Sequence, residues 1–197
     1  MIRLPQAGRG ARISIRAPLS YLLYSYVMRI VLATGIYPPE IGGPATYAAL
    51  LKNKLPQKHI EVDVIPFSAV RHLPRIMRHL VYAIRVYAHA RHADLVFVQD
   101  TVSTGFPAML ASMFSHKPLV LRVPGDYAWE QGTQRYGVRD TIDDFQARRY
   151  GPRVTLLRAL QRMVARYARL VISPSKYFSG IISTWGVPQS DIKVIYN

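Results

Sequence analysis

The sequence has 197 residues, 50% of them hydrophobic, which is enough for one well-buried domain and leaves little room for a second. It contains no cysteine, which excludes disulfide scaffolds, zinc–thiolate sites and cysteine nucleophiles and suits a reducing cytoplasm. The formal net charge of +15 predicts a surface that meets an anionic partner.

Residues 1–27 differ from the rest of the chain. They begin basic, contain no acid and end apolar, but no small-x-small cleavage site of a secretory signal follows. The uncharged run 17–28 falls short of the roughly 20 residues that a membrane-spanning helix needs. We therefore expect 1–27 to be a disordered or spurious extension, Met28 to be the functional start, and 28–197 to form a single folded domain.

From Met28 onward, short β-branched apolar runs alternate with stretches of helical periodicity. In chain order we expect a strand at 30–33, a helix at 45–55, a strand at 62–65, a helix at 73–90, a strand at 95–98, a helix at 103–114, a strand at 119–123, a helix at 152–168, a strand at 170–173, a helix at 175–185 and a strand at 192–195. Residues 125–150 are polar, aromatic and poorly periodic, which predicts a functional loop or short helices over a cleft. The alternation predicts an α/β domain, a doubly wound parallel sheet of the Rossmann-like class.

Charge is distributed unevenly along the chain. Acidic residues are absent from 64–93, which carries five Arg and four His, and from 145–190, which carries seven Arg and one Lys. In the helix expected at 73–90, basic residues crowd most faces, and an apolar stripe expected to face the core recurs at Leu73, Ile76, Met77, Leu80, Ile84 and Tyr87. The basic helices at 71–92 and 153–169 therefore predict a surface that faces phospholipid headgroups, nucleic acid or a phosphorylated substrate. The alternative is that these are ordinary solvated helix faces.

The turn after the first strand places Gly42 and Gly43 directly before a helix. Backbone N–H groups at a helix N-terminus bind phosphate or sugar hydroxyls, and glycine lets a ligand approach closely. The alternative is a tight turn without a ligand. The turn is not a G-x-G-x-x-G fingerprint and no Walker A pattern occurs, so dinucleotide and nucleoside-triphosphate sites are disfavoured.

Two further strand ends carry polar side chains, and parallel α/β sheets bind ligands at such ends. The fourth strand is followed by carboxylate, aromatic and cationic groups of the kinds that bind sugars, at Arg122, Asp126, Tyr127 and Glu130. The alternative for Asp126 is that it caps the next short helix. After the fifth strand, Ser175 is expected to cap its helix and Lys176 to reach an anion.

Other kinds of site are not expected. The six His residues show no pairing with carboxylates, and four of them lie in one basic helical region, which disfavours metal ligation. Asp140, Asp143 and Asp144 are interpreted as loop or helix-start acids. No Gly-x-Ser-x-Gly elbow is present, which argues against an α/β-hydrolase. We expect neither a metal nor a bound cofactor.

Four segments carry a family resemblance. The stretch 28–47 contains a strand, a Tyr-Pro-Pro turn and a Gly-Gly loop, and 123–130 reads Val-Pro-Gly-Asp-Tyr-Ala-Trp-Glu. A fifth-strand segment at 171–176 and the final residues 194–197 complete the set. In this order the segments resemble the N-terminal domain of glycosyltransferase family 4, and the second segment is similar to a bacterial subgroup. The resemblance covers 28–197.

The resemblance implies the N-terminal half of a two-domain enzyme with the B-type glycosyltransferase fold. Such an enzyme is a hexosyltransferase that retains anomeric configuration and needs no metal. Its donor and co-substrate would be a nucleotide-sugar, and its acceptor a glycan, a lipid-linked sugar or a small molecule. Gly42 and Gly43 would approach the donor phosphates and the acceptor. The place of action would be the bacterial cytoplasm or the inner membrane face, in polysaccharide or glycolipid biosynthesis, which suits the basic helices.

Two departures from the family's pattern matter. Many members carry a His after the fourth strand that organises the reacting sugar. This chain has Pro124-Gly125-Asp126 there, so either Asp126 takes its place as the catalytic residue or the site differs. The family's donor-binding Arg/Lys pair and paired glutamates lie in a C-terminal domain that begins just after Asn197. We therefore expect poor transfer or none unless a C-terminal glycosyltransferase domain is supplied in cis or in trans.

A second hypothesis is a non-catalytic Rossmann-like binding module whose basic helices dock on an anionic membrane or on nucleic acid. For the glycosyltransferase hypothesis, an anionic membrane surface is an expected partner and nucleic acid is not. The residues of this chain fix neither the sugar nor the nucleotide.

Overall fold

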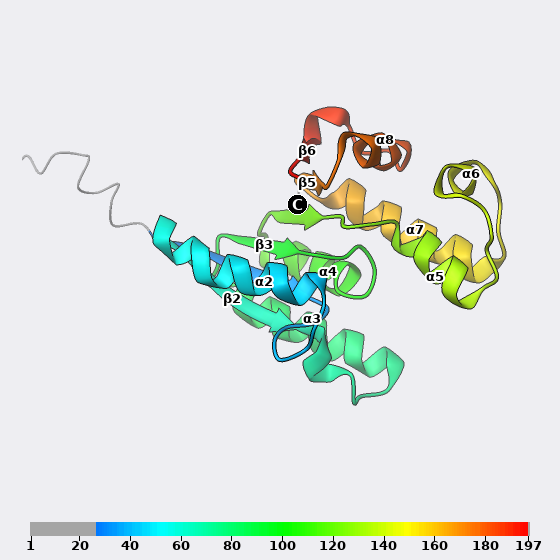
Figure 1. Ribbon diagram of the computed structural model, residues 1–197. Coiled ribbons are helices and arrows are strands. Elements are labelled where there is room, and N and C mark those ends of the chain that lie inside the picture. The colour runs from blue at the N-terminus through cyan, green and yellow to red at the C-terminus, as the bar shows by residue number, and fades with distance from the viewer. Residues whose placement is uncertain (1–26, 197) are drawn as a thin grey trace, which may run out of the picture.

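The computed structural model describes residues 27–196, so the expectation for 1–27 lies outside the described residues except at Val27. Six parallel strands form one sheet in the order β2-β1-β3-β4-β5-β6 (Figure 1). Their bounds are β1 (Met28–Thr34), β2 (Ile60–Pro66), β3 (Leu95–Val98), β4 (Leu119–Arg122), β5 (Leu170–Ser173) and β6 (Ile192–Val194). The sheet confirms the predicted doubly wound α/β fold, and the direction of winding switches between β1 and β3.

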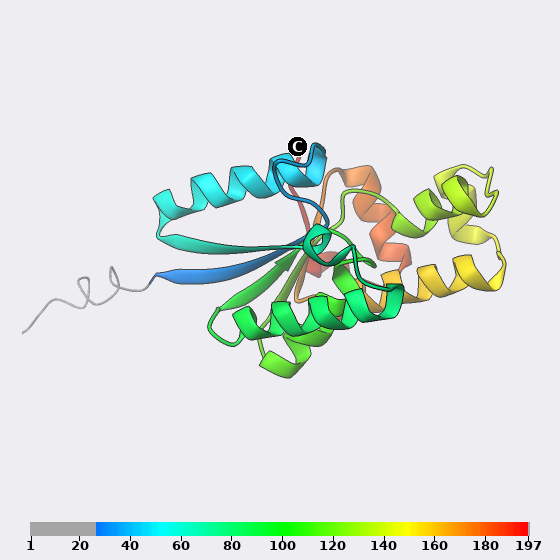
Figure 2. The ribbon, with the colours of Figure 1, turned by 90° about the horizontal axis from the view of Figure 1, so that it is seen from below.

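Helices cover both faces of the sheet. Figure 2 shows α2 on one side and α3 and α4 on the other. The bounds are α2 (Gly43–Lys54), α3 (Arg75–Ala90), α4 (Gly105–Ser115), α5 (Tyr127–Arg135), α6 (Ile142–Ala147), α7 (Pro152–Tyr167) and α8 (Lys176–Thr184). Three short 3₁₀ turns lie at Leu55–Lys58, Phe67–Val70 and Gln189–Asp191.

The central strands are apolar on both faces because both faces are covered. In β1, Ile30 and Leu32 pack with Ala48 of α2, whereas Val31 and Ala33 belong to the cluster on the α3 and α4 side. Successive side chains of β1 point to opposite faces of the sheet, so this one strand contributes to two separate cores. This double burial is what makes the strands recognisable as continuous apolar runs.

The segment 125–150 forms two short helices, α5 and α6, with turns between them, as the sequence predicts. With the first turns of α7 they extend beyond the carboxyl edge of the sheet (Figure 1). A small core holds them together around the fully buried Phe145, which packs with Ala128, Val138 and Val154. The segment is thus a packed unit at the end of the sheet where ligands bind in such folds.

Helix α3 buries a different face from the one that the apolar pattern indicates. Its buried residues are Tyr82, Val86 and Ala90, and the Tyr82 hydroxyl donates to the Ile65 carbonyl at 2.7 Å. Large apolar residues of the predicted stripe are exposed instead, at Ile76, Met77, Leu80 and Ile84. The apolar residues span more of the helix surface than the sheet can cover, so part of the stripe stays in solvent. Among the described residues, no helix combines the length and apolar character needed to cross a membrane.

Candidate functional site

Two adjoining hollows lie beyond the carboxyl ends of β1, β3 and β4, where the winding of the sheet switches. The smaller, of about 280 Å³, is lined by Gly35 after β1, Gln99 and Asp100 after β3, and Tyr127 and Glu130 of α5. The larger, of about 570 Å³, is lined by residues that include Gly43, Tyr47, Arg122 and Tyr196. Pro44 and Pro124 line both hollows, so the two share one ridge. Ligands of doubly wound folds bind at this position.

The first wall of the smaller hollow is the turn between β1 and α2. Glu40 in this turn accepts from the Arg71 guanidinium at 2.7 Å, and the Ser68 amide donates to the Gly35 carbonyl at 3.2 Å. A hydrogen bond from Ser68 is the largest cause that lowers the pKa of Glu40. These contacts fasten the turn to the segment after β2.

Asp100 builds the second wall by organising the start of α4. Its carboxylate accepts from the amides of Val102, Ser103 and Thr104 at 2.7, 3.0 and 2.9 Å. A helix begins with unsatisfied N–H groups, and the carboxylate supplies their acceptors. Asp100 therefore lines the hollow with oxygens that are already committed to the backbone.

Gln99 is the most unusual residue of the smaller hollow. Its side chain is 1% exposed, and neither its amide nitrogen nor its amide oxygen has a hydrogen-bond partner within residues 27–196. A buried polar group without a partner costs about 1–3 kcal/mol, so such groups are rare unless a ligand or water satisfies them. Gln99 is not among the binding residues predicted from the sequence. A polar residue directly after a buried strand is the signal that identifies it.

Glu130 reaches the same hollow from α5. The Cβ atom that a side chain at Gly125 would add lies 2.3 Å from Glu130 Oε1, so the carboxylate rests against that glycine. No hydrogen bond or ion pair engages this carboxylate within the described part of the chain. Burial raises the pKa of Glu130, and the negative charges of Asp126 and Asp100 raise it further. Glu130 is thus a half-buried carboxylate with free acceptor capacity.

Tyr127 stands beside Glu130 on the first turn of α5. The Ser103 hydroxyl donates to the Tyr127 hydroxyl at 2.9 Å, which leaves the phenolic proton available to a ligand. Burial raises the pKa of Tyr127. The structure therefore brings two of the predicted binding residues, Tyr127 and Glu130, into one hollow with Gln99.

Asp126 lies beneath the site rather than in it. The residue is 1% exposed, and one carboxylate oxygen accepts from the Trp129 amide at 3.0 Å, which caps α5. The same oxygen accepts from Gln161 Nε2 at 2.9 Å, and the other accepts from Gln146 Nε2 at 2.8 Å. The capping alternative for Asp126 is therefore realised. A direct catalytic contact by this residue stays a prediction, which its burial and committed oxygens disfavour.

The larger hollow contains Gly43 and Arg122, two more of the predicted residues. The Arg122 guanidinium carbon lies 4.1 Å from the centre of the Tyr47 ring, a cation–π contact, and the residue is largely buried. A Cβ atom at Gly43 would meet nothing within 4 Å, so the space over this residue is open. Gly42 precedes it as the residue before α2, and its carbonyl accepts from the Thr46 amide at 3.0 Å.

Lys176 is the predicted residue that lies apart from both hollows. It is the exposed first residue of α8. Ser175 caps this helix as predicted, because its hydroxyl accepts from the Phe178 amide at 3.1 Å. The acids Asp143 and Asp144 lie in the first turn of α6, as the sequence analysis interprets them. No group of three metal-ligating side chains occurs in the described residues.

A doubly wound parallel domain with a polar hollow at its switch point defines a Rossmann-like α/β ligand-binding domain. The model of a protein family, glycosyltransferase family 4, matches residues 41–197, and the chain belongs to this family. It therefore contains a glycosyltransferase-type domain. Among curated proteins, none matches the sequence significantly.

Solved structures support the fold. The chain is similar to Anabaena Alr3699/HepE in complex with UDP and glucose, at 18% identity and a TM-score of 0.54 over 87% of this chain. It is also similar to the UDP-glucose complex of that protein, at 20% identity and a TM-score of 0.51 over 86% of this chain. A third similar structure is a putative UDP-N-acetylglucosamine 2-epimerase from Listeria monocytogenes, at 18% identity and a TM-score of 0.51 over 85% of this chain.

The matched regions are parts of larger proteins. The chain spans 45% of the first Anabaena structure and 44% of the other two structures. At these identities the likeness concerns the fold alone, which a putative epimerase shares, so the fold does not define the reaction.

Proposed function

We propose that the chain forms the acceptor-side wall of a glycosyltransferase that moves a sugar from a nucleotide-sugar onto a glycan, a lipid-linked or a small-molecule acceptor. The observation that carries the proposal is the smaller hollow, which the half-buried Glu130 carboxylate and the buried Gln99 amide line, neither of them with a hydrogen-bond partner in the described structure. Amides and carboxylates are groups that hold sugar hydroxyls by hydrogen bonds. Family membership makes sugar transfer the reaction that such a site serves.

In this proposal Glu130 accepts a hydrogen bond from the acceptor hydroxyl. Its raised pKa makes it a better proton acceptor than an exposed glutamate, because burial destabilises the charged form. Gln99 and Tyr127 orient the same sugar. Asp126, which the sequence analysis proposes as catalytic, acts through the position of α5 instead.

The larger hollow is proposed to receive part of the donor. Gly42 precedes α2 and Gly43 begins it, and the N-terminal N–H groups of this helix suit a phosphate. Arg122 supplies a cation at the same hollow, and Lys176 would meet an anion only if the donor extended to the start of α8. The similar Anabaena protein binds UDP and glucose in one structure and UDP-glucose in another.

We further propose that transfer retains anomeric configuration and needs a second, donor-binding domain in cis or in trans. Support for the second domain comes from the matched structures, which are about twice the length of the matched region. The proposed place of action is the cytoplasm or the inner face of a bacterial membrane, in polysaccharide or glycolipid biosynthesis.

Sugar transfer tests the proposal. The chain is assayed with a panel of UDP- and GDP-sugars, alone and together with a donor-binding domain of the same family. We expect transfer only with that domain, and an NMR assignment of the product anomer that shows retention. Glu130→Gln should lower kcat/KM by about 100-fold, because it removes the proton acceptor.

Glu61→Gln is the matched control, because Glu61 lies in an exposed ion pair with Arg29 on the other side of the fold from the hollows. It should transfer sugar like the parent. Undiminished transfer by Glu130→Gln would remove the site assignment, and full transfer by the chain alone would refute the need for a second domain.

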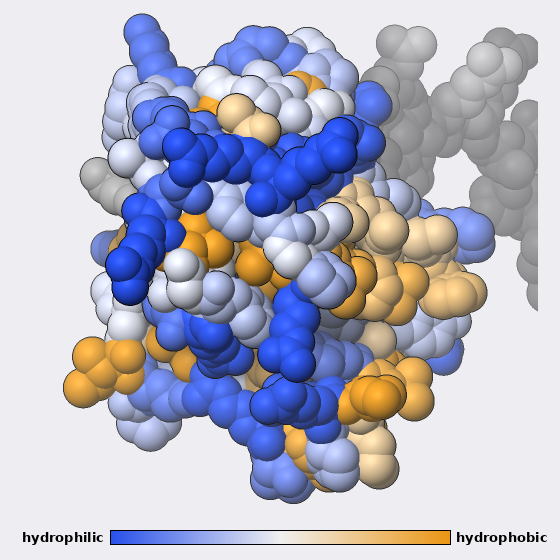
Figure 3. Space-filling view, turned by 90° about the vertical axis from the view of Figure 1, so that its right-hand side faces the viewer, coloured by the Kyte–Doolittle hydropathy of each residue, from blue (hydrophilic) through white to orange (hydrophobic). Residues whose placement is uncertain are grey.

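A second candidate function, docking on an anionic membrane, is favoured by one observation. Exposed apolar side chains gather on α3 and α4, with Ile76 85%, Phe114 72% and Leu80 61% exposed. Leu80, Tyr87 and Phe114 line a hollow of about 400 Å³ between the two helices. Figure 3 shows hydrophobic residues gathered along one side of the face that it presents, beside hydrophilic ones.

The charge of α3 decides which occupant suits this apolar surface. Segment 64–93 carries five Arg and four His and no acid, which opposes a second copy of the same cationic chain and favours an anionic bilayer. Apolar insertion combined with basic residues is the pattern of peripheral membrane binding. This function is compatible with sugar transfer to a lipid-linked acceptor, and it replaces transfer if the chain is a non-catalytic module.

A further inference from the structure

We propose that a crevice between α6 and α7 is a binding site for a phosphate or diphosphate group, separate from the two hollows of the candidate site. The crevice has a volume of about 450 Å³ and is lined by residues of the α6–α7 loop and α7. Four of the lining residues are arginines, and none is acidic: Arg148, Arg149, Arg158 and Arg162. The inference does not depend on sugar transfer.

Arg158 is the fixed group of this site. Its guanidinium donates to the carbonyls of Arg148 and Gln146 at 2.7 and 2.8 Å and lies over the Phe145 ring, 4.9 Å from its centre. These contacts hold the guanidinium in place but neutralise no charge. A guanidinium has five N–H donors, so further donors remain for a ligand.

Arg162 adds a second charge one helical turn later. Its side chain has no hydrogen bond or ion pair with any residue of 27–196, and it is half-buried. Like charges four residues apart destabilise a helix. The pKa of Arg158 is lowered, mainly by burial and in addition by the positive charge of Arg162. An anion bound between the two side chains would relieve this repulsion.

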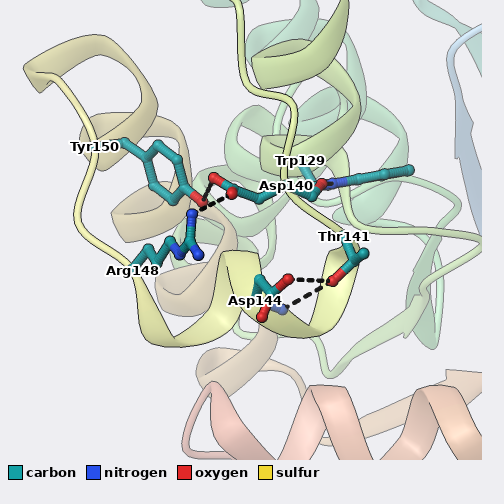
Figure 4. A network of polar contacts seen from close by, with 6 residues as sticks. All are labelled: Trp129, Asp140, Thr141, Asp144, Arg148 and Tyr150. Carbon is teal, nitrogen blue, oxygen red and sulfur yellow. Dashed lines mark hydrogen bonds and ion pairs between the residues drawn. The ribbon is translucent and has the colours of Figure 1, made fainter.

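The nearest carboxylates do not line the crevice, although Asp140 forms an ion pair with one of its four arginines, Arg148. Asp140 accepts from Arg148 and, at 2.6 Å, from the Tyr150 hydroxyl, and its carbonyl accepts from the Trp129 indole (Figure 4). Asp126 is buried and accepts from Gln146 and Trp129. The first network fixes Arg148 and Tyr150 as the rim of the crevice. Neither acid lines the space itself.

Phosphate fits this set of groups better than other anions. Arginine forks bind phosphate oxygens in a bidentate manner, and several forks around a concave space suit one phosphate or a diphosphate. The volume lies within the usual range of ligand pockets, about 300–1,000 Å³. The phosphate can belong to a soluble ester or to a lipid headgroup, and the chemistry of the site is the same for both.

Titration of the full chain with inorganic pyrophosphate tests the site, by calorimetry and by NMR of the arginine side chains. We expect saturable binding. Arg162→Gln and Arg158→Gln should each weaken the Kd about tenfold, as expected for loss of one charge-assisted fork. Arg162→Gln keeps the test valid if Arg158→Gln disturbs the fold, because the Arg162 side chain makes no hydrogen bond or ion pair within residues 27–196.

Arg169→Gln is the matched control. It removes an exposed arginine just after the same helix and outside the crevice, so it changes net charge equally. Its Kd should stay within about twofold of the parent. Equal weakening by Arg162→Gln and Arg169→Gln, or no saturable binding, would overturn the proposal.

Two further arms identify the source of the phosphate. One uses sugar 1-phosphates, and the other uses vesicles of phosphatidylcholine with phosphatidic acid or phosphatidylglycerol. Competition of pyrophosphate with the sugar phosphates assigns a soluble ester. If the chain binds the vesicles, if Arg162→Gln weakens that binding and if pyrophosphate competes with it, the phosphate belongs to a lipid headgroup. If neither ligand competes with pyrophosphate, the proposed site is wrong.

Discussion

A single buried carboxylate fixes the geometry around the candidate site at the scale of residues. Asp126 caps α5 and connects it to α6 and α7 through the amides of Gln146 and Gln161. Glu130 lies one helical turn after this cap, so its reach into the smaller hollow depends on where α5 starts. Asp126 is therefore a positioning residue in our interpretation.

Asp126→Asn should destabilise the protein by about 1–3 kcal/mol, because the new amide places a donor against buried donors. Urea unfolding followed by circular dichroism measures this change. The substitution also removes a negative charge that raises the pKa of Glu130, so that pKa should fall, as read from the carboxyl carbon by NMR.

Asp63→Asn is the control for this prediction, since Asp63 is exposed and its carboxylate has His89 as its one side-chain partner within residues 27–196, a pairing that the sequence did not indicate. Its free energy of unfolding should change by less than about 0.5 kcal/mol. A stable Asp126→Asn protein with an unchanged Glu130 pKa would contradict the positioning role.

Several site residues were predictable from the sequence because strand ends of a parallel sheet converge. Gly43, Arg122, Tyr127 and Glu130 line the hollows for this reason. The environment of each side chain was not predictable. Asp126 and Gln99 are equally buried and differ in hydrogen bonding: Asp126 accepts from three protein donors, whereas the Gln99 amide has no partner in the described structure, and the sequence carries no direct record of that difference.

At the scale of elements, patterns with a clear beginning and end were predicted closely. The observed β3 and β5 have the expected bounds, and α7 begins at Pro152, a residue suited to the first turn of a helix. The order of the strands was not predicted, because periodicity says which faces are buried but not which strands are neighbours. The face of α3 was predicted wrongly, since its apolar residues extend around more than one side.

Substitutions at two glycines test whether a helix needs glycine where its backbone closely approaches a neighbouring segment. A Cβ atom at Gly105, the first residue of α4, would lie 2.3 Å from the Asp100 carbonyl oxygen and 3.3 Å from Val164. Gly105→Ala should therefore destabilise the protein by more than about 1 kcal/mol, since the clash outweighs the helix propensity of alanine.

Gly180→Ala in α8 is the matched substitution, because nothing lies within 4 Å of its new Cβ atom. It should stabilise the protein by about 0.5–1 kcal/mol, the helix preference of alanine over glycine. Thermal unfolding of both variants gives the comparison. If both substitutions change the stability in the same direction, Gly105 is not needed for the close approach of α4 to the Asp100 turn.

At the scale of the whole molecule, net charge and an apolar surface act together. The formal charge of +15 draws the chain to any polyanion, whereas apolar insertion distinguishes a bilayer from nucleic acid. The two attractions differ in their response to salt, because screening weakens charge and leaves hydrophobic burial largely intact.

In sedimentation with phosphatidylglycerol vesicles, the parent chain should bind. The double substitution Ile76→Gln and Leu80→Gln should weaken this binding about tenfold or more, because apolar burial is lost. Duplex DNA binding should be unchanged by these substitutions and be lost as salt rises. Leu50→Gln, on α2 at the opposite face of the sheet, is the control and should bind vesicles like the parent. Equal loss with all these variants would exclude α3 as the contact.

The ridge shared by the two hollows is made of Pro44 and Pro124. Proline has no N–H group, so this ridge offers a ligand carbonyl acceptors and a stiff shape but no backbone donors. Discrimination between ligands at the ridge must come from the side chains that surround it. Preference for one sugar over another could therefore shift through a few replacements at positions such as Gln99, with the underlying chain path left unchanged.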